Sequence, residues 1–69
     1  EKEVECVATI VFILKEKGSL NENQIIENFK LWSEDKANRF SETEILNGVE
    51  NLYNHNIIQK DLIGFRVNS

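Results

Sequence analysis

The fold is decided by residues 41–67, which read SETEILNGVENLYNHNIIQKDLIGFRV. This stretch opens with Ser41 and Glu44, which have the S-x-x-E spacing of a capping box. In a capping box the serine hydroxyl accepts the backbone N–H of the glutamate, and the glutamate carboxylate accepts the N–H of the serine. A helix is therefore predicted to begin at this point.

The residues after the cap repeat with helical spacing. Ile45, Val49 and Leu52 lie at i, i+4 and i+7 and predict one buried face. Leu46 and Tyr53 widen this apolar face. The opposite face is polar and carries Asn47, Glu50, Asn51 and Asn54. The helix is predicted to end at the Asn-His-Asn of residues 54–56, because these residue types form helix poorly and asparagine tolerates left-handed backbone.

A short hairpin is predicted to follow this helix. Residues 57–60 begin with two isoleucines and predict a first strand. Residues 63–67 predict a second strand, in which apolar residues alternate with others. The buried side of the second strand is expected to consist of Ile63, Phe65 and Val67. Asp61 and Leu62 lie between the two runs and are predicted to form the turn.

A first, central helix is predicted over residues 3–17, ending at Gly18, which can adopt the left-handed conformation of a helix terminator. Its buried face is expected to consist of Val4, Val7, Ala8, Val11 and Leu14, broadened by Ile10 and Ile13. A second helix is predicted over residues 22–33, with Asn21 as its N-cap and Gln24 three residues further on.

Aromatic residues near the end of the second helix are predicted to complete the core. Trp32 shares a helical face with Ile25 and Phe29, so we expect it to be buried. Residues 34–39 are polar and mixed in sign, and we expect a solvated connection there. Phe40 precedes the cap of the third helix and is expected to pack back onto the core.

Length, composition and charge narrow the possible functions. The 69 residues suffice for one small domain, and the lack of any Met suggests a piece of a larger protein. Eight Lys and Arg against twelve Asp and Glu give a net charge of −4, whereas domains that bind phosphate backbones are usually basic. The apolar run at residues 7–14 is shorter than the ~20 residues of a bilayer span. We therefore expect neither nucleic acid nor a membrane as the main partner.

Few residues are candidates for catalysis or metal binding. The single Cys6 excludes a disulfide framework and favours a reduced, intracellular setting, and we expect it as a small apolar side chain at a helix edge. His55 is the only histidine, and sequence spacing places no Ser, Cys or carboxylate to act with it. One cysteine and one histidine cannot make a metal site. We expect no catalytic residue, metal or cofactor, and a solvent-facing His55.

Three helices followed by a hairpin predict an α+β fold of the winged-helix type, with residues 1–69 forming a single domain. In such folds the third helix and the hairpin, or wing, flank the binding surface, and in DNA-reading versions the third helix enters the major groove.

The charge of the predicted third helix argues against DNA. No Lys or Arg occurs in residues 41–58, and carboxylates such as Glu42 and Glu50 would face phosphates. Three cationic residues near this helix could offset the repulsion between its carboxylates and the phosphates: Arg39, Lys60 and Arg66. Since asparagine can pair bidentately with adenine, Asn47 or Asn54 could still read a base. A DNA-binding winged helix of a transcription or replication protein therefore stays open as an alternative, as does a winged helix appended to a larger ATPase.

Several stretches resemble a known family. Residues 10–15, IVFILK, resemble the I-V-x-I-M-K stretch in the last winged-helix domain of cullins. Residues 49–61, VENLYNHNIIQKD, look like the cullin segment I-E-x-L-I-x-x-x-Y-L-x-R-D without a gap, and residues 39–40 also have a cullin counterpart. The resemblance spans nearly the whole chain.

The resemblance is closest to the cullin-like subunit 2 of the anaphase-promoting complex. Residues 19–20 and 24–25, followed by FKLW at residues 29–32, are similar to its S-L-x-x-x-x-I and L-R-M-F pattern. The ending IGFRVN, residues 63–68, is similar to its G-V-Y-R-L tail, where ordinary cullins close with Tyr-Leu-Ala.

The resemblance implies a non-enzymatic part of a RING-type ubiquitin ligase in the nucleus and cytoplasm. It would help to position the RING subunit and the ubiquitin-conjugating enzyme, and the other complex subunits would be further partners. Lys15 matches the position at which ordinary cullins receive a ubiquitin-like modifier. The subunit-2 branch is not expected to use that modification, and a lysine in the last turn of a helix is explained by the helix dipole alone.

From exposure alone, we expect the partner-binding surface to be Glu42, Glu50 and Asn54 on the third helix, with Lys60 and Arg66 on the wing.

Overall fold

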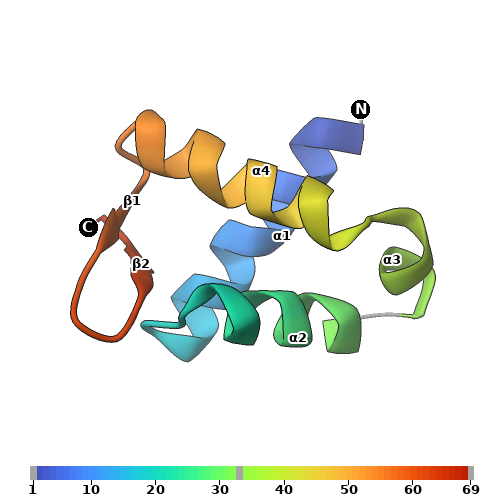
Figure 1. The fold of residues 1–69 in the computed structure, drawn as a ribbon, viewed down its shortest axis with the longest axis horizontal. Coiled ribbons are helices and arrows are strands. Elements are labelled where there is room, and N and C mark those ends of the chain that lie inside the picture. The colour runs from blue at the N-terminus through green and yellow to red at the C-terminus, as the bar shows by residue number, and fades with distance from the viewer. Residues whose placement is uncertain (1, 33, 69) are drawn as a thin grey trace.

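The computed structural model describes residues 2–32 and 34–68 and shows helices followed by an antiparallel hairpin, an α+β arrangement (Figure 1). In chain order its elements are α1 (Lys2–Lys17), α2 (Glu22–Trp32), α3 (Glu34–Arg39), α4 (Glu42–Asn54), β1 (Ile58–Lys60) and β2 (Phe65–Val67). Figure 1 shows α1 behind α2 and α4, with the hairpin at one end of the molecule and α3 at the other.

The core lies where α2, α4 and the hairpin pack on α1. Its buried apolar residues include Ile10, Ile13 and Leu14 of α1, Ile25 and Phe29 of α2, Ile45, Val49 and Leu52 of α4, and Ile58 of β1. Phe40 is buried as predicted, and its ring meets that of Phe29 at 5.4 Å in an edge-to-face arrangement. α4 packs closely on α1 at Gly48, where an added Cβ would lie 2.9 Å from Ile10 Cδ1.

The predicted caps at Asn21 and Ser41 and the predicted helix end at Gly18 are confirmed. In the capping box of α4, the Ser41 N–H donates to Glu44 Oε1 at 2.9 Å and the Glu44 N–H donates to Ser41 Oγ at 3.2 Å. Asn21 and Gln24 form the same reciprocal pair at the start of α2, at 2.9 and 2.8 Å. Gly18, after α1, has φ +91°, in the left-handed region that favours glycine.

The hairpin is tied to the connection between α1 and α2. β1 and β2 pair antiparallel, with Ile58 opposite Val67. On its other side β2 meets Leu20: the Leu20 N–H donates to the Phe65 carbonyl at 3.0 Å, and the Phe65 N–H donates to the Leu20 carbonyl at 2.7 Å. β2 therefore lies between β1 and the residue-20 segment, which fixes the hairpin against the helices.

The side chains described in the connection at residues 34–39 are exposed as predicted, but the segment also forms a short helix, α3, that was not predicted. Two features stabilise it. Glu34 and Asp35 lie in its first turn, where the helix dipole favours negative charge. Arg39 ion-pairs with Asp35 at 3.5 Å and with Glu5 of α1 at 2.9 Å, which attaches α3 to the bundle.

Trp32 and Ile63 were predicted to be buried but are exposed. Trp32 keeps 42% of its surface exposed, because α2 buries Ile25, Ile26 and Phe29 and leaves its last residue beside Phe12 on the outer side of α1. Ile63 is 64% exposed, because it belongs to a four-residue loop at 61–64 and not to β2. The turn is thus two residues longer than predicted, and the first strand begins one residue later.

The predicted buried face of α1 was also wrong in part. Leu14, Ile10 and Ile13 are buried, but Val4 and Ala8 are exposed, and Cys6 and Thr9 are buried instead. Tyr53, which was expected to widen the apolar face of α4, is 46% exposed. The predicted last residue of the second helix, Ser33, lies outside the described residues.

We expect Gly64→Ala to destabilise the domain. A Cβ at this position would overlap the Leu20 carbonyl and the Asn21 backbone, neither of which can rotate away. The free energy of unfolding in urea should fall by about 1–3 kcal/mol, as for overpacked sites. The exposed neighbour provides a control: Ile63→Ala should change it by less than about 0.5 kcal/mol. If Gly64→Ala were as stable as the natural protein, the close contact between the hairpin and the connection at Leu20 would be contradicted.

Candidate protein-interaction surface

The exposed face of α4 is polar and has no cationic residue. The capping box sets the helix register, so that Ile45, Val49 and Leu52 point into the core. The solvent side then carries Glu42, Thr43, Asn47, Glu50 and Asn54. With no Lys or Arg in the helix, carboxylates and amides dominate this face. A phosphate backbone would meet repulsion here, whereas a basic or mixed polypeptide surface would not.

The carboxylates at the start of α4 already have partners within the chain. Glu42 Oε2 lies 2.8 Å from Lys30 Nζ of α2, and Glu44 Oε2 lies 3.0 Å from Lys2 Nζ of α1. The pKa of Glu44 is held below its usual value, first by the hydrogen bond from the Ser41 backbone N–H and then by Lys2. Glu50, two turns further along, has no such ion pair among the described side chains, so it is the acid on α4 that is most open to an outside partner.

Glu50 borders a hollow between α4 and the hairpin, which we call the α4–wing hollow. Its volume is about 250 Å³, and its lining residues are Glu22, Leu46, Asn47, Val49, Glu50, Tyr53, Lys60 and Phe65. The rings of Tyr53 and Phe65 meet edge-to-face at 6.0 Å, and Lys60 Nζ lies 5.8 Å from the centre of the Phe65 ring. The hollow thus has an apolar floor with two carboxylates and one ammonium group at its edge.

The structure brings together only some of the predicted surface residues. Glu50 and Lys60 both line the α4–wing hollow, and Asn54 lies beside Lys60 in an adjoining depression. Glu42 is engaged with Lys30. Arg66 instead borders a separate hollow, together with Lys15 of the last turn of α1. When the side-chain amide of Gln59 in β1 is oriented with its nitrogen towards Asn68 and its oxygen towards Arg66, the oxygen accepts a hydrogen bond from Arg66 Nε at 2.9 Å.

The sequence analysis did not identify the apolar part of this surface. Leu46 and Phe65 pack against the core as predicted but also line the hollow, and Tyr53, which was assigned to the buried face as well, lines it as an exposed side chain. Glu22 was seen only as part of a helix start. One feature of the sequence could have indicated this surface. Leu46 and Tyr53 are seven residues apart, so they lie on the same side of the helix, next to its buried face.

The tip of the wing is held by Asp61. Its Oδ1 accepts from the N–H groups of Ile63 and Gly64 at 2.9 and 2.8 Å, and its Oδ2 accepts from Ser19 Oγ at 2.6 Å. The Ser19 hydroxyl and these backbone groups hold the pKa of Asp61 below its usual value. Leu62, at the tip, is fully exposed. The wing therefore presents an apolar tip on a loop with a fixed backbone.

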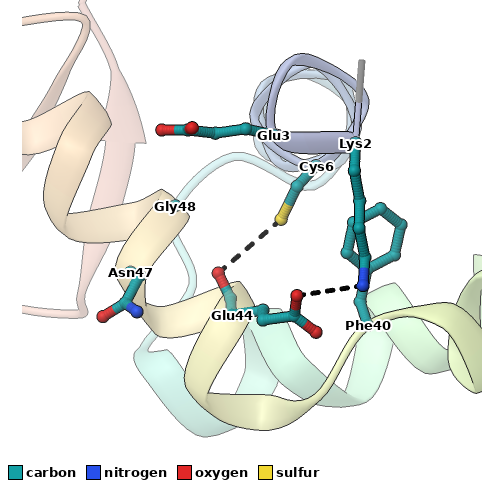
Figure 2. A pocket seen from close by; sticks show the side chains of 7 residues that line it. All are labelled: Lys2, Glu3, Cys6, Phe40, Glu44, Asn47 and Gly48. Atoms are coloured by element: carbon teal, nitrogen blue, oxygen red, sulfur yellow. Dashed lines mark hydrogen bonds and ion pairs between the residues drawn. The ribbon is translucent and has the colours of Figure 1, made fainter.

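A second hollow lies at the start of α1 and α4 and contains the only cysteine (Figure 2). Figure 2 shows Lys2 bridging to the Glu44 carboxylate above the Phe40 ring, while the Cys6 thiol points to the Glu44 carbonyl at 3.8 Å. Burial, and then the charge of Glu44, raises the pKa of Cys6 to about 11. The thiol is therefore neutral near pH 7 and a poor nucleophile.

His55 is exposed just after α4, with Nδ1 2.8 Å from the Asn51 carbonyl. Within residues 2–32 and 34–68 no three His, Cys, Asp or Glu side chains are grouped to hold a metal ion. The described helices include none that is long and apolar enough to cross a membrane.

Comparison of the chain with models of known protein families, with curated proteins and with solved structures gave no match.

Acid should destabilise the fold through Asp61 and Glu44. Since both carboxyls have a lowered pKa in the folded state, the unfolded chain binds more protons at low pH. Their contribution is complete above a pH of about 5.5, where both carboxyls are ionised in the unfolded chain too, and is lost as the pH falls through the lowered pKa values of the folded state. In urea titrations at several pH values, Asp61→Asn should weaken this pH dependence, while Glu27→Gln, at an exposed site on α2, should preserve it. An Asp61→Asn variant with unchanged acid sensitivity would refute the role of the loop carboxylate.

Cys6 should be unreactive in the folded protein. At pH 8 iodoacetamide should modify it many times more slowly than in urea, because the thiol is buried and its pKa is about 11. Stability should also decline as the pH rises from about 9 towards 11, since the unfolded chain loses this proton first. Equal rates of modification with and without urea would show that the thiol is accessible.

Proposed function

We propose that this chain is a winged-helix domain that binds a polypeptide partner through α4 and the wing. The topology supports the winged-helix assignment: β2 pairs with β1 in a two-stranded hairpin and forms an isolated bridge with Leu20, and β1 packs against α4. The hairpin and α4 then border one continuous surface, as expected for a wing and its neighbouring helix.

The observation that carries the proposal is the character of the α4–wing hollow. Leu46, Tyr53 and Phe65 supply an apolar floor, and Glu22 and Glu50 place negative charge at its edge. A protein partner can place an apolar side chain in such a hollow and a basic residue against Glu50. A DNA duplex would have to bring phosphates close to the same carboxylates, which costs free energy at every contact.

The resemblance to cullins narrows the partner class. By that resemblance, the domain belongs to a cullin-like scaffold subunit of a RING-type ubiquitin ligase, of the anaphase-promoting complex type. Its role is to help position the RING subunit and the ubiquitin-conjugating enzyme, without catalytic residues of its own. Because such a domain is covalently joined to a large scaffold, even a weak contact is favoured by a high effective concentration.

We expect this chain to bind a cognate ubiquitin-conjugating enzyme or RING subunit in isothermal titration calorimetry, and Glu50→Lys to weaken the binding about tenfold by charge reversal at the hollow. Glu27→Lys makes the same charge change on an exposed site of α2 and should bind like the natural chain.

In reconstituted ubiquitylation, removal of the domain from its scaffold should lower the rate of ubiquitin transfer while the scaffold remains assembled.

Two results would overturn the proposal. One is that Glu50→Lys and Glu27→Lys weaken partner binding equally, which would show that the hollow is not part of the interface. The other is unchanged ubiquitin transfer by a scaffold that lacks the domain.

A further inference from the structure

The described cationic side chains fall into two groups. Towards the α3 end of the molecule each has an ion pair: Lys2 with Glu44, Lys30 with Glu42, and Arg39 with Glu5 and Asp35. The other group lies at the end of α1 and on the hairpin, which Figure 1 shows close together, and has no ion pair with any described carboxylate: Lys15, Lys17, Lys60 and Arg66.

Two of these free cations border one hollow, between the last turn of α1 and β2. We call it the α1–β2 hollow. Its volume is about 500 Å³, and Lys15, Gly18, Arg66 and Val67 are among its lining residues. Lys17 and Lys60 border other hollows instead. Lys15 and Arg66 are therefore the pair that can meet a single ligand.

The carboxylates nearest to this hollow in the sequence are directed elsewhere. Glu16 lines the hollow on the α2 side of α1. Asp61 accepts from Ser19 Oγ and from two backbone N–H groups of its own loop. No described carboxylate lines the α1–β2 hollow itself, so its charge is positive.

The backbone of Val67 is unpaired on the side of this hollow. The Asn68 N–H donates across the hairpin to the Ile57 carbonyl at 3.0 Å. Bonded and non-bonded pairs alternate along an antiparallel ladder, so the N–H and carbonyl of Val67 point away from β1. Those of Phe65 point the same way and bond to Leu20. In the described part of the chain, Val67 has no such partner.

We propose that the α1–β2 hollow binds an acidic segment of a polypeptide, whose backbone bonds to Val67 and whose carboxylates meet Lys15 and Arg66. This surface is separate from the α4–wing hollow, and the inference does not rest on the proposed function.

The free backbone of Val67 favours a peptide over a phosphate group. It offers one donor and one acceptor on the same side, and a peptide unit supplies the matching acceptor and donor. An ionised phosphate has only acceptors and would leave the Val67 carbonyl unpaired. The hollow also adjoins the last turn of α1, where the negative end of the helix dipole opposes a doubly charged anion more than a single carboxylate.

The expected binding is weak. Lys15 and Arg66 are both exposed, and exposed ion pairs contribute little individually. For a short acidic peptide we therefore expect a dissociation constant on the order of a millimolar at low salt, which rises as salt screens the charges.

An NMR titration of the ¹⁵N-labelled chain with an end-capped hexaglutamate peptide tests this proposal. The amide signals of Gly18, Arg66 and Val67 should shift most, and the amide proton of Val67 should move downfield as it gains a hydrogen bond. Inorganic phosphate, titrated in parallel at the same ionic strength, should shift these signals less.

A matched pair of variants tests the place of binding. Lys15→Gln and Lys17→Gln remove the same charge from exposed positions in the last turn of α1, but only Lys15 borders the α1–β2 hollow. Lys15→Gln should raise the dissociation constant for hexaglutamate about fivefold, and Lys17→Gln by less than about twofold. Glu50→Lys, on α4, should leave the Val67 shift in place, which separates this result from the test of the proposed function. Circular dichroism should show that each variant is folded.

Three results would overturn the proposal. The first is the absence of shifts at Gly18, Arg66 and Val67 up to about 10 mM peptide, tenfold above the expected dissociation constant. The second is equal weakening by the two lysine variants, which would place the peptide elsewhere. The third is phosphate binding as tight as peptide binding, which would make the hollow a site for anions in general.

Discussion

The pairing of Phe65 with Leu20 is the constraint on which the arrangement of the surface depends. Two backbone hydrogen bonds join these residues, and the Ser19 hydroxyl adds a bond to Asp61 at the other end of the loop. Gly64 permits the approach, since any side chain there would overlap the Leu20 backbone. Because the segment between α1 and α2 is thus joined to the hairpin, the wing has a fixed orientation and Phe65 closes the α4–wing hollow.

Features set by neighbours within four residues could be predicted from the sequence. The caps at Asn21 and Ser41 depend on side chains three residues apart, and the left-handed residues Gly18 and Asn56 depend on their own backbone preferences. The inner face of α4 was also predictable, because its polar and apolar sides differ clearly. In each case the information is local.

What could not be predicted depends on packing between distant segments. α1 is apolar on both sides, so periodicity alone cannot say which side meets α4 and which stays open. The burial of Trp32 was mispredicted for a related reason, since its partner is Phe12 on the outer side of α1. Likewise, the meeting of Glu50 and Lys60 in one hollow follows from the turn after α4, while Arg66 lies at a different hollow.

The central claim is that α4 and the wing recognise a polypeptide and not a nucleic acid. A ¹⁵N–¹H NMR titration of the labelled chain tests it most directly, with a cognate ubiquitin-conjugating enzyme in one series and a DNA duplex at low salt in another. The account predicts that the enzyme shifts the amide signals of Leu46, Glu50, Tyr53 and Lys60, and that the duplex shifts none of them. Shifts of these same signals by the duplex, lost steeply as salt is added, would contradict it.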